Sequence, residues 1–362
     1  MRIAIGAILS VQGGPARYAS ELIHALARTP GEHELTIVCD RAAGLQSANG
    51  AIKDVIEIPL RHPWEQGFWE ERAAAALRSK RIDLYHGTKG TLPLHLRLPK
   101  VVTVHDLAVF HQPKSFAWLQ RVHQRVLVPL SVRMARRIIT DSAHARDDLC
   151  TTLGVPSDRV TIVPLAAREV FEPGPHAADA AILQRHGVKP PYILYAGTLQ
   201  PRKNVELLVQ AYQHLGVPGL YLVLAGRCRP GYSPWFLARP PHGLMYVGEV
   251  EDQSLAALYR NALAFCSPSG YEGFGLSFLE AMACGCPVVA PEHTSIPEVL
   301  GTAAFYLSRL DVPSLVDALS RLCRDPELRL ELRQRGLERA RRFSWSLTAE
   351  QTLNVYREAL HG

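Results

Sequence analysis

The sequence lacks a long apolar run, since no stretch reaches the about 18 consecutive apolar residues that suggest a membrane-spanning helix. Its first residues, Met1 to Gly6, are typical of a β-strand and lack a basic segment followed by an apolar stretch and a cleavage site. The seven cysteines are odd in number, scattered, and without the spacing of a zinc site. We therefore expect a cytoplasmic chain with reduced thiols and no signal peptide.

Motifs for metals and for dinucleotide cofactors are also missing. Neither an Asp-x-Asp pair nor a His/Cys cluster is present, so we expect no metal ion and no bound cofactor. The loop from Ser10 to Pro15 carries Gly13 and Gly14 but does not match Gly-x-Gly-x-x-Gly. A strand before this loop and a helix after it place the glycines at the carboxyl end of the first strand, where α/β proteins bind ligands. A tight turn without a ligand is the alternative.

Acidic residues are outnumbered, and the formal net charge is +6. Most of the excess lies in residues 1–172, which hold 22 Lys and Arg against 17 Asp and Glu. These cations are spread out with little aromatic interleaving, which argues against nucleic acid and favours, if anything, an anionic surface such as a membrane. The arginine-rich stretch 116–137 predicts a helix. We interpret it as a domain helix with a solvated basic face, and a helix lying on the inner membrane face is the alternative.

The chain is long enough for two domains, with 362 residues of which 47% are hydrophobic and 20% charged. Strand and helix patterns alternate in two successive series along the chain. Residues 168–191, which are rich in proline, predict a linker between the two series. The fold class is therefore α/β, with two Rossmann-like, doubly wound domains. We predict an N-terminal domain at 1–172, a C-terminal domain at 173–345 and a C-terminal helix at 346–362.

The segment from Ser269 to Gly285 holds two glutamates, Glu272 and Glu280, with glycines between them. It predicts a loop followed by a short helix, with Glu272 before the helix and Glu280 within it. Glycines let backbone N–H groups approach a ligand, and a helix N-terminus favours an anion such as a diphosphate. Because carboxylates accept hydrogen bonds from hydroxyls, the pattern is typical of a nucleotide-sugar site. The alternative is an ordinary loop and core helix with two solvated glutamates.

Two adjacent cations, Arg202 and Lys203, follow another predicted strand that ends before Gly197. A strand-to-helix turn with two cations can neutralise a diphosphate, whereas cations at a helix start are otherwise mildly unfavourable. A solvent-exposed basic helix start is the alternative.

Two histidines fall at strand ends in the N-terminal half. His105 follows the clearest strand of this half and precedes Asp106, which suggests a functional role. His86 ends another strand, and there capping or core packing is the preferred interpretation. Asp141 or Ser142 is expected to cap the helix that begins at Ala143.

Together these motifs, in this order, resemble the Glu-x7-Glu family of retaining glycosyltransferases, the GT4-like family with the GT-B fold, over nearly the whole chain. The resemblance implies a deep cleft between the two domains and a last helix that crosses back to the N-terminal domain. It implies that Glu272 positions the donor sugar, that Glu280 binds the ribose and that Arg202 and Lys203 hold the phosphates. It implies that His105 contacts the sugar. The remaining donor-binding positions that it implies are Gly13, Gly14, Thr198, Gly248, Gly273, Phe274, Gly275, Leu276 and Ser277.

This sequence departs from the family pattern at two of these positions. Thr198 stands where many members carry arginine, so the phosphate charge must come from Arg202 and Lys203. Ser277 stands where proline is usual, which removes a rigid helix start and adds a hydroxyl.

The resemblance implies a metal-independent transfer of a hexose, with retention, from a nucleoside-diphosphate sugar to an acceptor hydroxyl. Mannose from GDP-mannose is favoured, since the motifs look most like those of bacterial mannosyltransferase-type members that build surface polysaccharides. The acceptor is a sugar, a lipid-linked glycan or a small molecule. The alternatives are a sugar-nucleotide epimerase on the same fold and a non-catalytic nucleotide-sugar binding module. A phosphorylase would need a lysine-bound pyridoxal phosphate, for which no signature is found.

Overall fold

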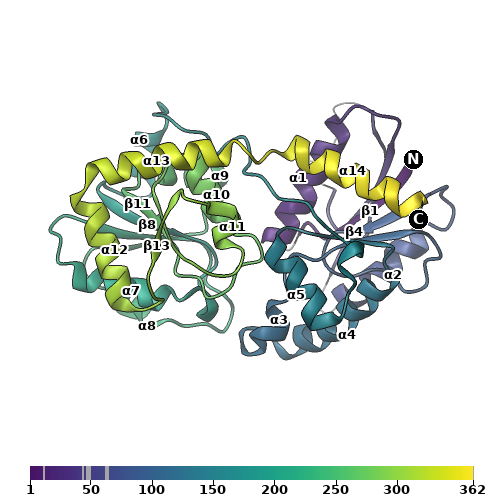
Figure 1. Cartoon of the computed structure of the whole chain (residues 1–362), viewed down its shortest axis with the longest axis horizontal. Helices are drawn as coiled ribbons and strands as arrows, with labels where there is room; N and C mark the ends of the chain where they lie inside the picture. Colours follow the sequence, from purple (N-terminus) through teal and green to yellow (C-terminus); the bar gives the residue numbers. More distant parts are fainter. Residues whose placement is uncertain (11–12, 43–44, 46–49, 62–64, 362) are drawn as a thin grey trace. The chain divides into compact units, whose positions relative to one another are not determined.

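The computed structural model describes residues 1–10, 13–42, 45, 50–61 and 65–361. Two compact units make up the chain (Figure 1). Unit 1 comprises Met1–Leu165 together with Ser344–Gly362, and unit 2 comprises Ala166–Phe343. The C-terminal helix therefore belongs to the same unit as the N-terminus.

Unit 1 is built on a parallel sheet, seven-stranded in the described residues, with the order β3-β2-β1-β4-β5-β6-β7. The order reverses direction at β1, because the chain adds β2 and β3 on one side and β4 to β7 on the other. Its central strands are buried on both faces, as parallel strands covered by helices must be. The strands are β1 (Arg2–Ala7), β2 (Glu34–Cys39), β3 (Ile52–Glu57), β4 (Leu84–Gly87), β5 (Lys100–Thr103), β6 (Arg137–Thr140) and β7 (Val160–Ile162).

Helices connect and cover these strands. The first of them begins with Pro15 in its first turn, where the missing N–H costs nothing. The long helix α4 (Trp118–Met134) ends just before β6. The helices of unit 1 are α1 (Gly14–Arg28), α2 (Gln66–Ala76), α3 (Ala108–His111), η2 (Pro113–Ser115), α4 (Trp118–Met134), α5 (Ala143–Leu153), η3 (Ser157–Arg159) and α14 (Trp345–His361).

Unit 2 repeats the architecture with a parallel sheet in the order β10-β9-β8-β11-β12-β13. Its strands are β8 (Tyr192–Ala196), β9 (Tyr221–Ala225), β10 (Leu244–Gly248), β11 (Ala264–Cys266), β12 (Val288–Pro291) and β13 (Ala304–Leu307). Its helices are α6 (Asp179–Arg185), η4 (Pro201–Lys203), α7 (Val205–Leu215), α8 (Trp235–Ala238), α9 (Asp252–Asn261), α10 (Leu276–Ala283), α11 (Ile296–Leu300), α12 (Val312–Arg324) and α13 (Pro326–Ala340). The prediction of two doubly wound α/β domains is thus confirmed.

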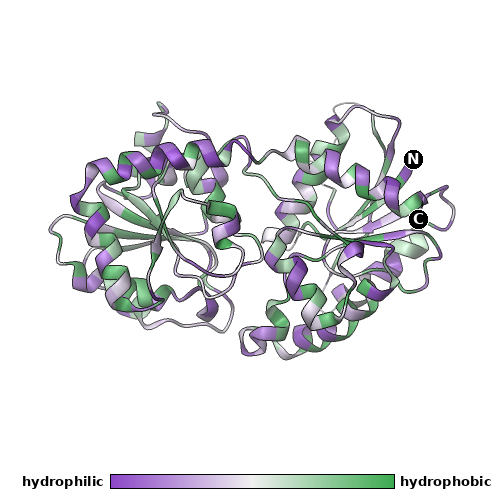
Figure 2. Ribbon diagram, in the orientation of Figure 1, coloured by the Kyte–Doolittle hydropathy of each residue, from purple (hydrophilic) through white to green (hydrophobic). Residues whose placement is uncertain are grey.

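Hydropathy follows the layers. The strands of unit 2 are largely apolar, while α13 is drawn mostly in hydrophilic colours (Figure 2). Only Leu332 and Gly336 of α13 are buried. A helix of this kind covers the sheet layer from outside and leaves most of its residues in solvent.

The predicted linker at 168–191 is wrong as a description of the whole stretch. It contains α6, and the Asp179 carboxylate of α6 accepts hydrogen bonds from the Arg260 guanidinium of α9, 2.5 Å and 2.9 Å long. Both side chains are less than a tenth exposed. The change from unit 1 to unit 2 falls between Leu165 and Ala166, seven residues before the boundary predicted at 172. The proline content indicated that a connection lies in this stretch. It did not indicate that much of the stretch packs as part of unit 2.

The stretch 116–137 forms a helix whose arginines are exposed or half-buried, which agrees with the predicted solvated basic face, but little of its apolar side is buried. The helix spans Trp118–Met134, and its buried residues are Val128, Ser131 and Val132. The apolar residues that recur at helical spacing along this stretch are mostly exposed: Trp118, Val122, Val126 and Leu130.

Candidate functional site

Three neighbouring strands of unit 2 end in glycines that pack backbone against backbone. Gly197 N donates to Ala225 O (2.9 Å), and Gly226 N donates to Gly248 O (2.6 Å). A Cβ on Gly226 would lie 2.1 Å from Gly197 O, so no other residue fits there without moving the chain. These carboxyl ends of β8, β9 and β10 form the edge at which parallel sheets bind ligands.

The cations predicted to hold phosphates lie directly after β8, in η4. Arg202 Nη1 donates to Tyr271 O (2.5 Å), and Arg202 O accepts from Gly270 N (2.8 Å). Asn204, with φ 50°, ends η4 in the left-handed region, and its side-chain amide donates to Pro268 O (3.0 Å). The two loops are thereby fixed to each other, so η4 and the glutamate segment form one structure.

Lys203 and Glu272 form an ion pair at the centre of this structure. Their side chains are only 13% and 9% exposed. Burial alone would raise the pKa of the Glu272 carboxyl, but the charges of Lys203 and Arg202 outweigh it and lower that pKa. Glu272 is also held through its backbone, because Ser295 Oγ donates to Glu272 O (3.0 Å). The pair presents a fixed carboxylate and a fixed ammonium side by side.

The helix predicted after the glutamate loop is α10, and Gly275 is its N-cap with φ 94°. A Cβ at Gly275 would lie 2.9 Å from Cδ2 of Phe278, so glycine is required there by both conformation and space. Leu276 and Ser277 form the half-buried first turn. Glu280 lies within the helix and is 2% exposed, which contradicts the alternative of a solvated glutamate.

Two further predicted donor-binding positions lie in the same loop, and one in the turn after β8. Gly273 is buried, and Phe274 packs edge-on against Phe343 with ring centroids 5.9 Å apart. Phe274 therefore holds the loop against the rest of unit 2. Thr198 is half-buried, and its carbonyl accepts a hydrogen bond from the Tyr195 hydroxyl (3.1 Å). The structure brings the donor-site residues predicted after β8 and after β11 together.

In unit 1 the predicted glycine loop leads into α1. Gly13 has φ 146° and Gly14 opens the helix, while residues 11 and 12 of the loop lie outside the described ranges. About one turn of the helix later, the Tyr18 hydroxyl is 2.9 Å from Thr103 Oγ1. These residues belong to the carboxyl edge of the unit 1 sheet, as predicted.

His105, at the same edge, is paired with a carboxylate. Its Nδ1 lies 2.7 Å from Asp141 Oδ2, and Tyr18 packs edge-on against its ring with centroids 4.7 Å apart. Burial alone would lower the pKa of His105, but the Asp141 carboxylate raises it above 6.5. With Nδ1 fixed by Asp141, the orientation of the ring and of Nε2 is set.

His86 is a core residue, as the sequence favoured. Its Nδ1 lies 2.7 Å from the Tyr356 hydroxyl of α14, and its Nε2 lies 2.8 Å from Thr103 Oγ1. Burial and, secondarily, the charge of His105 lower the pKa of His86 to about 3. This neutral histidine joins the C-terminal helix to the strand that leads to His105.

Sequence reasoning missed Asp141 as a functional residue. It was considered only as a helix cap, but the cap of α5 is Ser142, whose Oγ accepts from Ala145 N (3.1 Å). Asp141 is 2% exposed and faces His105 instead. A polar residue at the carboxyl end of β6, next to β5, was the available signal.

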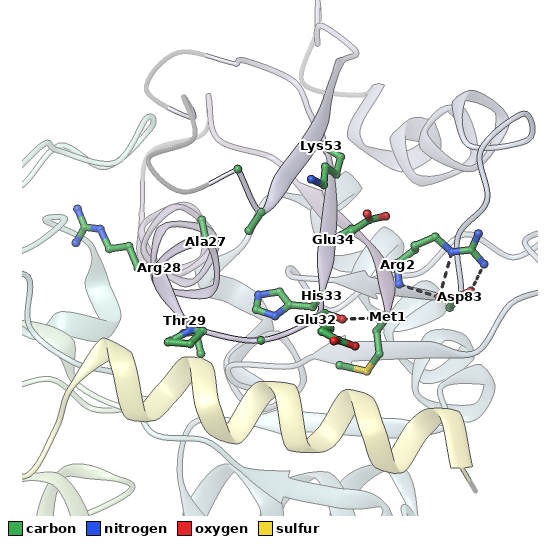
Figure 3. Close-up of a pocket in the computed structure, with 14 residues that line it drawn as sticks. Met1, Arg2, Ala27, Arg28, Thr29, Glu32, His33, Glu34, Lys53 and Asp83 are labelled. Atoms are coloured by element: carbon green, nitrogen blue, oxygen red, sulfur yellow. Dashed lines mark hydrogen bonds and ion pairs between the residues drawn. The ribbon is translucent and has the colours of Figure 1, made fainter.

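A hollow of unit 1 lies away from these residues (Figure 3). It is lined by the amino ends of the first strands, where Met1 N donates to Glu32 O (2.9 Å) and Arg2 pairs with Asp83. It is therefore at the opposite edge of the sheet from His105. Within the described ranges, no three His, Cys, Asp or Glu side chains are grouped to hold a metal ion. No helix in the same part of the chain is both long and apolar enough to cross a membrane.

Comparison with known proteins identifies the family. The model described as Glycosyltransferase Family 4 matches residues 12–167, and the model described as Glycosyl transferases group 1 matches residues 181–339. The O-antigen chain mannosyltransferase B of Escherichia coli is 34% identical over 299 residues, which cover 79% of this chain and 77% of that protein. This chain belongs to the family 4 glycosyltransferases.

A second relative of this glycosyltransferase is the MMP alpha-(1->4)-mannosyltransferase of Mycolicibacterium hassiacum. It is 31% identical over 345 residues, covering 85% of this chain and 80% of the relative. Among solved structures, the sucrose-phosphate synthase from Thermosynechococcus elongatus matches with a TM-score of 0.79 at 22% identity, covering 99% and 98% of the two chains. The glycosyltransferase thus has the GT-B fold that the sequence predicted.

Proposed function

We propose that this glycosyltransferase moves mannose from GDP-mannose to a hydroxyl of a glycan acceptor, with retention of configuration. The observation that carries the proposal is the buried Lys203–Glu272 pair, fixed beside Arg202 and ahead of α10. Both relatives described above are named mannosyltransferases, which supports mannose over other hexoses. Neither the epimerase nor the binding-module alternative gains support from them.

The donor would be held by charge and by hydrogen bonds from different parts of unit 2. Arg202 and Lys203 would neutralise the diphosphate, and the first turn of α10 at Leu276 and Ser277 would offer it backbone N–H groups. Glu272 would accept hydrogen bonds from the sugar hydroxyls, and Glu280 from the ribose. Main chain at Gly248 would border the base.

The same residues would favour departure of the nucleoside diphosphate. The bond between the sugar C1 and the phosphate oxygen breaks, and charge grows on the phosphate, where Lys203 and Arg202 stabilise it. The acceptor oxygen bonds to C1 from the same face, and its proton passes to the leaving phosphate. Because Glu272 is held in an ion pair, we assign it to positioning the sugar rather than to attacking it.

Metal independence follows as part of the proposal. Cations are required to offset the diphosphate charge, and two protein cations already lie at the end of β8. We also propose that His105, held by Asp141, contacts the donor sugar. We take the acceptor to be a glycan chain, as the name of the O-antigen chain mannosyltransferase suggests, and propose the lipid-linked form among the acceptors considered above.

The test is a thermal-shift titration with GDP, UDP, ADP and their sugars, with and without EDTA, followed by transfer assays with the best donor. Stabilisation by GDP and GDP-mannose, unchanged by EDTA, is expected. A response to UDP alone would overturn the mannose donor, and no response to any nucleotide would overturn the donor site itself. The anomeric configuration of the product, measured by NMR, tests retention.

A further inference from the structure

Exposed large hydrophobic side chains gather on α4. Of the eleven that the structure exposes across its described residues, five belong to this one helix. At 3.6 residues per turn their positions fall within an arc of roughly 120°. We call these five the α4 apolar stripe: Trp118 (67% exposed), Leu119 (55%), Val122 (44%), Val126 (52%) and Leu130 (37%).

The stripe is exposed because the opposite side of α4 holds the helix on unit 1. Val128, Ser131 and Val132 are buried there, and Ser131 Oγ accepts a hydrogen bond from Leu92 N (2.9 Å). The helix lies at the margin of the unit beside α3 (Figure 1). Both faces are thus used, one for folding and one turned outward. An outward helix face that carries five large apolar side chains marks an interaction surface.

Only positive charge accompanies the stripe. Residues 107–140 contain no Asp or Glu. Lys114, Arg121 and Arg133 make no ion pair within the described part of the chain. By contrast, Arg136 and Arg137 at the end of this segment bind α14, through Ala359 O (3.0 Å) and Glu358 (3.3 Å). No ion pair of the described residues therefore depends on these three cations, whereas Arg125 of α4 contacts α3 by donating to Phe110 O (3.2 Å).

We propose that the α4 apolar stripe and its cations dock unit 1 on the surface of a bilayer containing anionic lipids. A helix lying in the membrane interface buries its apolar side among the acyl chains while its cations attract anionic headgroups. A second copy of this chain, laid stripe to stripe, would bring the same cations together without a carboxylate to offset them. The charge therefore favours a lipid surface over a dimer.

The placement of α4 gives this docking a consequence for the reaction. A crossover helix between parallel strands starts at the carboxyl edge of the sheet, so Trp118 and Leu119 lie toward the edge that carries His105. This end of α4 also lies near Lys89, just beyond β4. About one turn after Leu119, burial and, secondarily, the charge of Lys89 lower the pKa of His123. Docking would bring a lipid-carried acceptor to this edge. That part rests on the proposed function, whereas vesicle binding does not.

The experiment is co-flotation of the full chain with vesicles, of pure phosphatidylcholine or with added phosphatidylglycerol, at low and high salt. Binding to the anionic vesicles that weakens with salt is expected. Replacing two cations, Arg121→Gln with Arg133→Gln, should weaken it about 25-fold, since each such cation contributes about a fivefold factor. The stripe variant Trp118→Ala/Val126→Ser should weaken it at least tenfold.

Matched controls come from unit 2, where Trp235 is 41% exposed. Trp235→Ala should leave vesicle binding unchanged. GDP-induced thermal shift should be the same in all variants, which separates failure of docking from failure of the donor site. Equal binding of the stripe variant and the parent chain would overturn the proposal. So would absence of binding to anionic vesicles, or a dimer that the stripe variant abolishes while vesicles bind neither protein.

Discussion

Lys203 and Glu272 form an ion pair although 69 positions separate them in the chain. The pair joins η4, after β8, to the loop before α10, and it is nearly excluded from solvent. A buried pair of this kind stabilises little as a whole, but removing one partner leaves a buried charge unpaired. The pair is therefore both a structural connection and the proposed donor site.

Lys203→Ala should destabilise unit 2 by about 3 kcal/mol, the lower end for a broken buried pair, because Arg202 still offsets part of the Glu272 charge. Urea unfolding measures this. Lys80→Ala is the matched control: its partner is Asp54, at 2.6 Å, but the two side chains are 44% and 35% exposed. Its cost should stay below about 1 kcal/mol.

Lys203→Ala should also lower kcat more than donor affinity, because leaving-group charge grows in the transition state. Equal losses would contradict that role.

Asp141→Asn should shift the titration of His105 to lower pH, since burial then acts on the imidazole without the carboxylate that raises its pKa. In the parent chain the folded pKa exceeds 6.5. The contribution of His105 to stability is thus full below pH 6.5 and is lost as the pH rises through the folded value. Histidine NMR titration measures the shift.

Asp106→Asn provides the control for that titration. Asp106 also raises the pKa of His105, but less than Asp141 does. The expected order is therefore a small shift for Asp106→Asn and a larger one for Asp141→Asn. The reverse order would show that Asp141 does not hold His105.

Tyr356→Phe should destabilise unit 1 by about 1–3 kcal/mol, because it leaves Nδ1 of the buried His86 without its partner. Hydrogen exchange of α14 should accelerate, while nucleotide-induced thermal shift should not change. Tyr306→Phe, which removes a hydrogen bond to Gly301 O (2.6 Å) in unit 2, should leave exchange of α14 unaltered. A loss of transfer activity in Tyr356→Phe without a loss of stability would instead make His86 a functional residue.

Gly226→Ala should weaken nucleotide binding as well as stability, since the new Cβ would meet Gly197 O at 2.1 Å and displace the turn that leads to Thr198 and η4. Gly216→Ala is the comparison. Gly216 has φ 58°, and a Cβ there would meet no atom within 4 Å, so only about 1–2 kcal/mol of backbone strain is expected. Equal effects of the two substitutions on nucleotide affinity would contradict the role of the packed glycines.

Local patterns were sufficient for much of this account. The run from Gly273 to Glu280 predicted a loop, a glycine start and a helix, because glycine conformation and helix capping depend on neighbours in sequence. The strands of both sheets except β13 were recognised from short apolar runs, and their alternation with helices predicted two doubly wound domains.

Partners distant in sequence were not predictable in the same way. Nothing local marks Asp141 as the partner of His105, or Tyr356 as the partner of His86. The exposure of Trp118 was missed because periodicity locates an apolar side of a helix but does not say what covers it. Tertiary packing turned that side outward and placed Ser131 inward.

The most direct test of the donor site is calorimetric titration of GDP into the parent chain and into Glu280→Ala. The buried Glu280 carboxylate is proposed to accept hydrogen bonds from the ribose, worth about 1.5–3 kcal/mol. Its loss should weaken binding by about 10- to 150-fold. Glu338→Ala, on the exposed α13, should bind GDP like the parent chain. Unchanged affinity in Glu280→Ala would contradict the assignment of the ribose to Glu280 and, with it, the proposed orientation of the donor.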